Sequence, residues 1–259
     1  MKSNTSTDVY CVFVYLDKKA AERFKARYQK IFKKIITIDI QDEVYQKSFF
    51  EFSGYQVGLD LIIDTDYGNI KKIVFVNDTF INGHIKFAST SVIENIVESL
   101  RGKNDNFLVG IRRQNLLVSS KYYISTWCFG ICISNCASSK LDFLCGFKSQ
   151  HELLQSSTLK RGHFYEKVMT WLNPSSIFRG WHNAPYFQKL ERQKLDRKLI
   201  SIYLENCIPI HNEFILGLPL SVTMSKHYFR DSKTKVGLSL DRCYLNYKKI
   251  LKRSLKLLT

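Results

Sequence analysis

Short apolar segments alternate with amphipathic segments through the first half of the chain. Runs rich in β-branched and aromatic residues predict strands at Val9–Leu16, Lys34–Ile40, Lys72–Val76, Asn106–Ile111 and Tyr122–Ile133. Helical spacing of apolar residues between these runs predicts helices at Lys18–Phe32, Ser53–Ile63 and Ser91–Leu100. This order predicts an α/β fold with an open, mostly parallel sheet and helices on both faces. The strands lack strict apolar–polar alternation, which is typical of strands covered on both sides.

The second half of the chain is dominated by helical patterns. Pro185–Asn206 is the longest predicted helix, and a proline suits its first turn. The preceding stretch, Arg161–Pro185, is rich in aromatic and turn residues. It is either a loop that covers a site or an aromatic cluster packed under the main core. We therefore divide the chain into an α/β half at 1–139, a helical part of the same domain at 140–239 and a C-terminal segment at 240–259.

The C-terminal segment, Leu240–Thr259, combines leucines and an isoleucine at helical spacing with several lysines and arginines. This pattern predicts a basic amphipathic helix. Such a helix either lies on an anionic membrane surface or docks on the folded domain.

The charge balance limits the kinds of partner that the protein can bind. The 259 residues carry a net charge of +16, which favours nucleic acid, an acidic lipid surface or phosphorylated small molecules. No run approaches the roughly 18 apolar residues that a membrane-spanning helix needs. The apolar run at Val9–Leu16 is interpreted as a core strand rather than as a signal peptide. We expect the protein in the cytoplasm, either free or peripheral on the inner face of the membrane.

The chain contains seven cysteines. This odd number favours reduced, buried thiols over a disulfide framework. Cys128, Cys132 and Cys136 recur every four residues within an apolar run that predicts a strand. On a strand, that spacing separates successive side chains by about 13 Å. All ligands of a zinc ion lie about 2.0–2.3 Å from the metal. The buried-thiol interpretation is therefore favoured over a zinc site.

The strand at Lys72–Val76 ends abruptly in Asn77, Asp78 and Thr79. Ligands of open α/β sheets bind outside the carboxyl ends of the strands, and a carboxylate there can hold Mg²⁺ or Mn²⁺. An Asn-Asp-Thr sequence is also ordinary turn chemistry. The residues alone leave both interpretations open.

Four segments resemble, in the same order, segments of bacterial cell-surface polysaccharide glycosyltransferases. This group includes the capsule, O-antigen and rhamnan-synthesis enzymes. The segments are Phe50–Ile62 (FEFSGYQVGLDLI), Lys71–Gly83 (KKIVFVNDTFING), Tyr122–Cys132 (YYISTWCFGIC) and Leu190–Asn206 (LERQKLDRKLISIYLEN). Each motif is loose, and the shared order carries the resemblance.

The resemblance implies a GT-A-type fold that binds a nucleotide-sugar donor in residues 1–139. In that fold a short acidic motif, usually Asp-x-Asp, holds a metal on the diphosphate of the donor. Asn77 and Asp78 take the place of this motif, so that Asp78 would be the ligand of Mn²⁺ or Mg²⁺. Ser53, Gly54 and Tyr55 would occupy part of the donor cleft, although the family's Asn and Asp are missing from this segment.

Sugar transfer needs positively charged groups that neutralise the departing diphosphate. An inverting enzyme also needs a carboxylate base that deprotonates the acceptor hydroxyl. Candidate bases are Glu205, Glu213, Asp142 and Glu152. Glu205 is preferred because it ends the helix that resembles a helix of the family.

Arg112 and Arg113 follow a predicted strand end, where Arg112 could contact phosphate. The implied acceptor is a growing polysaccharide or a lipid-linked oligosaccharide.

Two other functions remain open. Asn77 stands where the family has an acid, which keeps alive a catalytically inactive, transferase-like assembly protein. The net charge of +16 and the many aromatic residues are compatible with a basic nucleic-acid-binding module. However, most aromatic residues fall inside apolar runs, and no recognisable nucleic-acid-binding motif is present. Nucleic acid is therefore not the expected partner.

Overall fold

The computed structural model describes residues 8–42, 44–45, 48–65, 70–80, 91–118, 121–134, 141–160, 162–172, 191–212 and 215–216. The chain divides into two compact units, Met1–Pro219 and Leu220–Thr259, and all of these residues belong to the first. The predicted C-terminal helix at Leu240–Thr259 and the candidate base Glu213 lie outside the described residues.

The described residues form one six-stranded sheet in the order β2-β1-β3-β5-β4-β6. Its strands are β1 (Val9–Tyr15), β2 (Lys34–Asp39), β3 (Ile70–Asn77), β4 (Phe107–Gln114), β5 (Tyr122–Ser134) and β6 (Ile215–Leu216). β1 pairs in parallel with β2 and β3, and β4 pairs in parallel with β6. β5 runs antiparallel to both of its neighbours, β3 and β4.

The sheet is therefore mixed, and the prediction of a mostly parallel sheet is not confirmed. The difference lies in the link between β4 and β5, which spans only residues 115–121. Parallel neighbours need a long crossover connection, whereas antiparallel neighbours can be joined directly. Strand propensity located both strands but did not give their relative direction.

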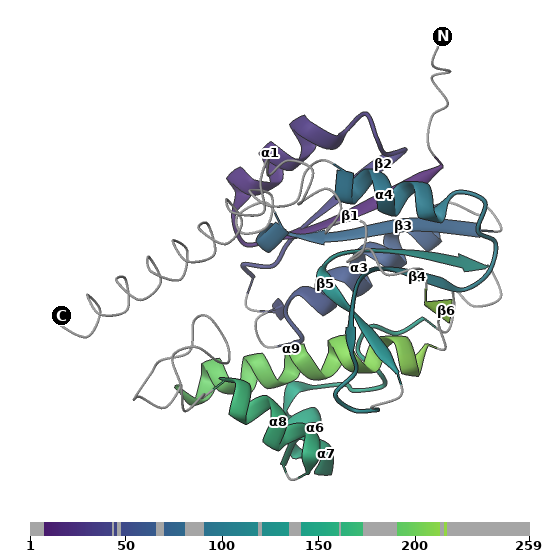
Figure 1. The fold of residues 1–259 in the computed structure, drawn as a ribbon. Helices are drawn as coiled ribbons and strands as arrows, with labels where there is room; N and C mark the ends of the chain where they lie inside the picture. The colour runs from purple at the N-terminus through teal and green to yellow at the C-terminus, as the bar shows by residue number, and fades with distance from the viewer. Residues whose placement is uncertain are drawn as a thin grey trace, which may run out of the picture. The chain divides into compact units, whose positions relative to one another are not determined.

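Helices cover both faces of the sheet, as the sequence predicts. They are α1 (Lys18–Tyr28), α3 (Glu51–Thr65), α4 (Ser91–Leu100), α6 (Gln150–Gln155), α7 (Ser157–Lys160), α8 (His163–Leu172) and α9 (Arg192–His211). Phe13 of β1 packs on α1 through Phe24, while its neighbour Val12 faces α3. Since successive strand residues point to opposite faces, α1 and α3 lie on opposite sides. Figure 1 shows α4 on the side of α1 and α9 on the side of α3, with α6, α7 and α8 beyond α9.

The prediction of the longest helix needs correction. The long helix predicted at Pro185–Asn206 is described from Arg192 and continues to His211. Glu205 therefore lies within α9 rather than at its end. The stretch predicted as a loop or an aromatic cluster contains α8, in which Phe164 is buried and packs against Tyr203 of α9. The remainder of that stretch, residues 161 and 173–185, lies outside the described residues.

Two glycines let α3 approach β1 closely. A Cβ added at Gly58 would lie 2.3 Å from Val12 Cγ1, and one added at Gly54 would lie 2.9 Å from Val14 Cγ1. Both valines are fully buried. Side chains at these positions would push the helix away from the sheet. The glycines therefore fix the first turns of α3 beside the carboxyl end of β1.

No helix among the described residues is both long enough and apolar enough to pass through a lipid bilayer.

Candidate active site

Asp78 follows β3 directly and binds the turn between β1 and α1. Its Oδ2 accepts hydrogen bonds from the backbone N–H groups of Leu16 (2.8 Å) and Asp17 (3.2 Å). Asp17 is the N-cap of α1, where its side chain accepts from the N–H of Lys19. The structure thus places Asp78 at the carboxyl end of a strand, as predicted, with a capping role in the fold.

The neighbouring groups fit a metal ion poorly. Asn77 Oδ1 accepts the N–H of Thr79 at 3.1 Å, which is the side-chain hydrogen bond of an Asx turn. One oxygen of Asp78 already accepts two backbone N–H groups. Within the described part of the chain, no three or more His, Cys, Asp or Glu side chains form a group that could hold a metal. The metal role of Asp78 stays a prediction.

The contacts of Asp78 predict different stabilities for two substitutions. Asp78→Ala removes the acceptor of two backbone N–H groups. Its free energy of unfolding should fall by about 1 kcal/mol, because water replaces part of this loss at a partly exposed site. Asp78→Asn keeps an acceptor oxygen and should remain close to wild type. Urea unfolding curves measure both, and equal stability of all three proteins would contradict a capping role.

Glu205 of α9 is held on β5 by a single residue, Thr126. Glu205 Oε1 accepts hydrogen bonds from the N–H of Thr126 at 3.1 Å and from its Oγ1 at 2.7 Å. Burial raises the pKa of Glu205, the charge of Glu51 raises it further, and the bonds from Thr126 oppose both effects. A carboxylate with a raised pKa is a stronger base than an exposed one.

Thr126 is also bound by a residue of α3. The hydroxyl of Tyr55, which is fully buried, donates to the carbonyl oxygen of Thr126 at 2.7 Å. Thr126 itself is only 5% exposed. The residue therefore joins α3, β5 and α9 and fixes the position of Glu205 relative to the sheet.

The direction of β5 brings Thr126 to the same edge of the sheet as Asp78. The last paired residues of β3 and β5 are Val76 and Cys128. Two residues beyond this pair come Asp78, just after the end of β3, and Thr126 on β5. The carboxyl ends of β1 and β3 and the first half of β5 thus meet at one edge of the sheet.

Glu51, the first residue of α3, adds a second partly buried carboxyl group near this edge. It precedes Tyr55 by four residues, so both side chains lie on the same face of the helix. Burial raises the pKa of Glu51. The cations Lys198 and Arg197 of α9 lower that pKa, and the charge of Asp78 raises it. The carboxyl groups of Glu51, Glu205 and Asp78 thus share one electrostatic environment with two cations of α9.

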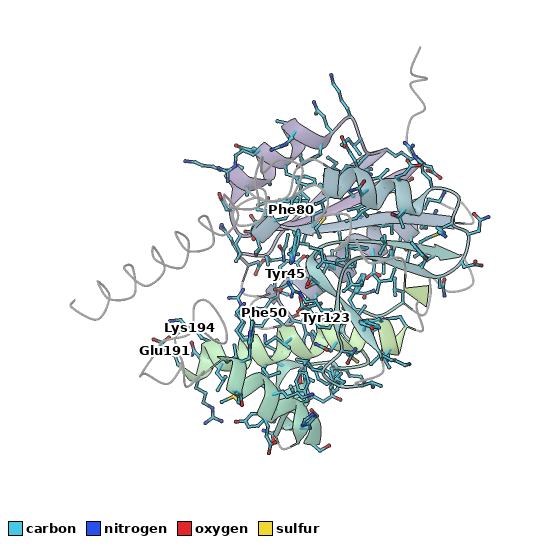
Figure 2. The ribbon with its side chains drawn as sticks, viewed as in Figure 1. Tyr45, Phe50, Phe80, Tyr123, Glu191 and Lys194 are labelled. Carbon is cyan, nitrogen blue, oxygen red and sulfur yellow. The ribbon has the colours of Figure 1, made fainter. Side chains whose placement is uncertain are left out.

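Aromatic side chains surround these charges. The guanidinium of Arg197 lies 4.3 Å from the ring centroid of Phe50, a residue with a positive φ of 55° just before α3. Burial raises the pKa of Tyr123 to about 12, an effect that the charge of Glu205 strengthens. In the view of Figure 2, the labelled residues Tyr45 and Phe50, which precede α3, and Tyr123 of β5 appear above α9.

Four further residues were predicted to bind the donor. Three of them, Ser53, Gly54 and Tyr55, lie in α3. Ser53 is 7% exposed and its Oγ accepts the N–H of Phe49 at 3.0 Å. Gly54 packs on Val14, and Tyr55 is a core residue. The donor-binding role of all three stays a prediction without added support. Arg112 belongs to β4, but its side chain lies outside the described residues.

Two of the remaining candidate bases cap local turns. The carboxylate of Asp142 accepts from the N–H groups of Leu144 and Gly146, and Glu152 accepts from the N–H of Lys148. Glu205 alone among the described candidates is hydrogen-bonded to the sheet at the edge where Asp78 lies.

Four residues of this arrangement were not predicted from sequence: Thr126, Glu51, Arg197 and Lys198. Glu51 lies within the first segment that resembles the family, but that segment lacks the expected Asn and Asp. Thr126, Arg197 and Lys198 occur in ordinary strand and helix patterns. No local signal marks them, since their roles depend on contacts between distant segments.

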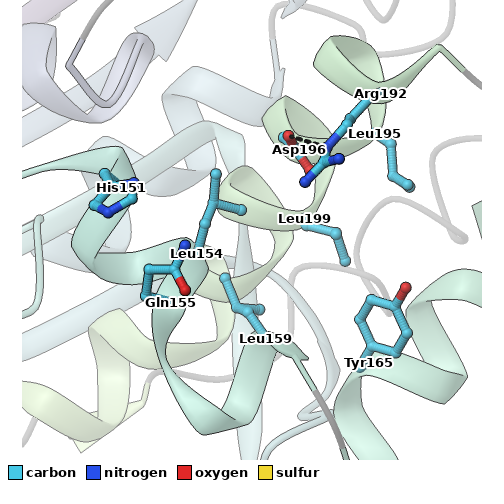
Figure 3. Close-up of a pocket in the computed structure, with 9 residues that line it drawn as sticks. All are labelled: His151, Leu154, Gln155, Leu159, Tyr165, Arg192, Leu195, Asp196 and Leu199. Carbon is cyan, nitrogen blue, oxygen red and sulfur yellow. Dashed lines mark ion pairs between the residues drawn. The ribbon is translucent and has the colours of Figure 1, made fainter.

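A separate pocket of about 470 Å³ lies among α6, α7, α8 and the first half of α9. Leucines 154, 159, 195 and 199 form its apolar wall with Tyr165. Figure 3 shows Arg192 and Asp196 at one side of it, joined by a 3.9 Å ion pair. None of the predicted site residues lines this pocket, so it is distinct from the edge that carries Asp78 and Glu205.

Comparison with models of protein families, with curated proteins and with solved structures gives no match for this chain. By its fold, the chain is an α/β protein with a mixed sheet flanked by helices.

Proposed function

We propose that the protein is a glycosyltransferase of GT-A type that moves a sugar from a nucleotide-diphosphate donor to a polysaccharide or lipid-linked acceptor. One observation carries the proposal: Glu205, whose pKa is raised by burial, is fixed through Thr126 at the sheet edge where Asp78 follows β3. The resemblance of four segments to polysaccharide glycosyltransferases supports the same conclusion independently of this geometry.

Glu205 is the proposed general base. Thr126 holds Oε1 with two hydrogen bonds, so the second carboxylate oxygen is the one that would take the proton of the acceptor hydroxyl. The buried surroundings raise the pKa of Glu205 and make its deprotonated form more basic. Removal of the proton makes the acceptor oxygen a better nucleophile toward the anomeric carbon of the donor.

The departing diphosphate needs positive charge in the transition state. Arg197 and Lys198 bring two cations of α9 close enough to lower the pKa of Glu51. The net charge of +16 favours the approach of an anionic donor. A membrane-bound acceptor would be reached if the basic segment Leu240–Thr259 holds the protein on the inner face of the membrane.

A thermal-shift screen with UDP, GDP and dTDP tests the proposal. Any nucleotide present at 100 times its dissociation constant should stabilise the fold by about 2.7 kcal/mol. We expect one nucleotide to raise the melting temperature more than the others at equal concentration. Inorganic diphosphate is the control for simple charge attraction. An equal response to diphosphate and to all nucleotides, or no response at all, would contradict a nucleotide-sugar site.

Repeating the screen with Mn²⁺ separates the metal prediction from the transferase proposal. A nucleotide response that grows with Mn²⁺ in wild type but not in Asp78→Asn supports a metal held by Asp78. A nucleotide response that Mn²⁺ does not change contradicts the metal prediction and leaves the transferase proposal intact.

The capping bonds of Asp78 favour one alternative, a catalytically inactive assembly protein with a transferase-like fold. In such a protein Asp78 would serve only to join β3 to the start of α1. The chain would then bind no nucleotide in the screen. Oligonucleotide binding with a steep salt dependence, in place of a nucleotide response, would instead indicate a nucleic-acid-binding module.

A further inference from the structure

Residues 142–147 form a turn that packs along one stripe of α9, on Tyr203, Cys207 and His211. These three residues recur every four positions and therefore lie on the same side of the helix. The ring of Phe147 meets the ring of Tyr203 with centroids 5.8 Å apart. At the other end, a carboxylate oxygen of Asp142 lies 3.9 Å from Nε2 of His211.

Hydrogen bonds between the backbone of Asp142 and the side chain of Asn212 hold the turn at the C-terminal end of α9. The N–H of Asp142 donates to Asn212 Oδ1 at 2.9 Å, and Asn212 Nδ2 donates to the carbonyl of Asp142 at 3.1 Å. The carboxylate of Asp142 also accepts from Leu144 and Gly146 within the turn. The turn is thus held against α9 on both sides of its middle residue, Cys145.

Cys145 consequently faces Cys207. Cys145 is 7% exposed and has a positive φ of 54°, while Cys207 is partly exposed on α9. The side chains of Cys145 and Tyr203 lie near the sulfur of Cys207, and their interaction with it lowers the pKa of Cys207. A donor that points at a sulfur atom stabilises the thiolate form of that sulfur.

We propose that Cys145 and Cys207 form a redox-active dithiol that a peroxide oxidises to a reversible disulfide. This inference does not depend on the proposed transferase activity. It rests on the packing of the turn against α9, which brings two reduced thiols into contact in the folded chain.

The chemistry assigns a different role to each sulfur. The hydrogen bond from Cys145 lowers the pKa of Cys207, whereas the same bond and burial raise the pKa of Cys145. The Cys207 thiolate attacks one oxygen of the peroxide, the O–O bond breaks and hydroxide leaves as water after taking a proton. Cys207 becomes a sulfenic acid. Cys145 then attacks the Cys207 sulfur, the S–O bond breaks, and a second water leaves with the proton of Cys145.

The other described cysteines are poorer nucleophiles. Burial raises the pKa of Cys11 well above its usual value, and it raises the pKa of Cys128 as well. Burial also raises the pKa of Cys132 to about 11. Thiolate content controls cysteine reactivity, so oxidation should begin at Cys207.

The test treats the reduced full-length protein with hydrogen peroxide, blocks remaining thiols with a maleimide in denaturant, and maps the peptides by mass spectrometry. We expect the number of free thiols to fall from seven to five, and dithiothreitol to restore it. The linked peptides should contain Cys145 and Cys207. No thiol loss, or a disulfide or sulfenic acid at another cysteine instead, would overturn the proposal.

Variants separate the two steps. Cys145→Ser should abolish the disulfide and leave a sulfenic acid at Cys207 that dimedone labels. Cys128→Ser replaces a buried cysteine on β5. It is the matched control and should form the same disulfide as wild type.

Oxidation of the chain unfolded in urea shows whether the fold directs the pairing. The Cys145–Cys207 link should dominate only in the folded protein, and equal yields in both states would overturn the proposal.

Discussion

Glu205→Gln is expected to lower the rate of glycosyl transfer by a factor of about 10²–10⁴, the usual contribution of a general base. Glutamine has a similar shape and keeps an oxygen that can accept the hydrogen bonds of Thr126. The variant therefore loses the proton acceptor but keeps the contact between α9 and β5. The measurement is the initial rate of transfer from the nucleotide sugar that the binding screen identifies.

Glu98→Gln is the matched control. Glu98 is an exposed residue of α4 that pairs with Arg101 at 2.6 Å, and an exposed ion pair contributes little to stability. This variant should keep the wild-type rate. A Glu205→Gln protein that melts like wild type and transfers sugar at the full rate would show that another group removes the proton.

The raised pKa of Glu205 also predicts the pH dependence of the reaction. The base acts in its deprotonated form, so kcat/KM falls as the pH drops through its pKa. Burial raises that pKa and the negative charge of Glu51 raises it further, which moves the acidic limb of the profile upward from the range of an ordinary glutamate. Glu51→Gln removes a negative charge and should move this limb to lower pH. An unchanged limb would show that Glu51 does not influence the base.

Gly58→Ala is expected to reduce the free energy of unfolding by about 1–3 kcal/mol, the typical cost of overpacking a core. The new Cβ would lie 2.3 Å from Val12 Cγ1. Val12 is β-branched, fully buried and paired on both sides in the sheet, so its side chain has little freedom to move. This steric cost exceeds the gain of about 1 kcal/mol in helix propensity when alanine replaces glycine. Chemical denaturation measures the change.

Two further variants control this experiment. Val57→Ala changes the adjacent, exposed residue of α3 to the same side chain and should stay within about 0.5 kcal/mol of wild type. Val12→Ala combined with Gly58→Ala relieves the clash, so the double variant should lose less stability than the sum of the two single variants. A Gly58→Ala protein as stable as wild type would contradict the close packing of α3 on β1.

Much of the fold could be predicted from sequence because strand and helix patterns are local. The β-branched runs located β1 to β5 close to their observed bounds, and helical spacing located α1, α3 and α4. The direction of β5 could not be predicted in the same way. It depends on the link to β4, and propensity describes residues rather than the relation between strands.

The candidate site was predicted only in part for a related reason. Asp78 was found because an acidic residue directly after a buried strand is visible in the sequence. The environment of Glu205 was not visible, since its partner Thr126 lies 79 positions earlier in the chain. The assignment of Ser53 and Gly54 to a donor cleft stays a prediction, while the structure shows Ser53 hydrogen-bonded to Phe49 and Gly54 packed on Val14. Short motifs do not distinguish a residue that binds a ligand from one that packs a helix.

The three-way contact at Thr126 has a consequence for how the protein folds. Its partners Tyr55 and Glu205 are 71 and 79 positions away, and such long-range contacts form slowly because large loops must close first. During synthesis, β1, β3 and β5 leave the ribosome well before α9. The proposed base can therefore reach its working position only after the last described helix has docked. Partly synthesised chains would contain most of the sheet and still be inactive.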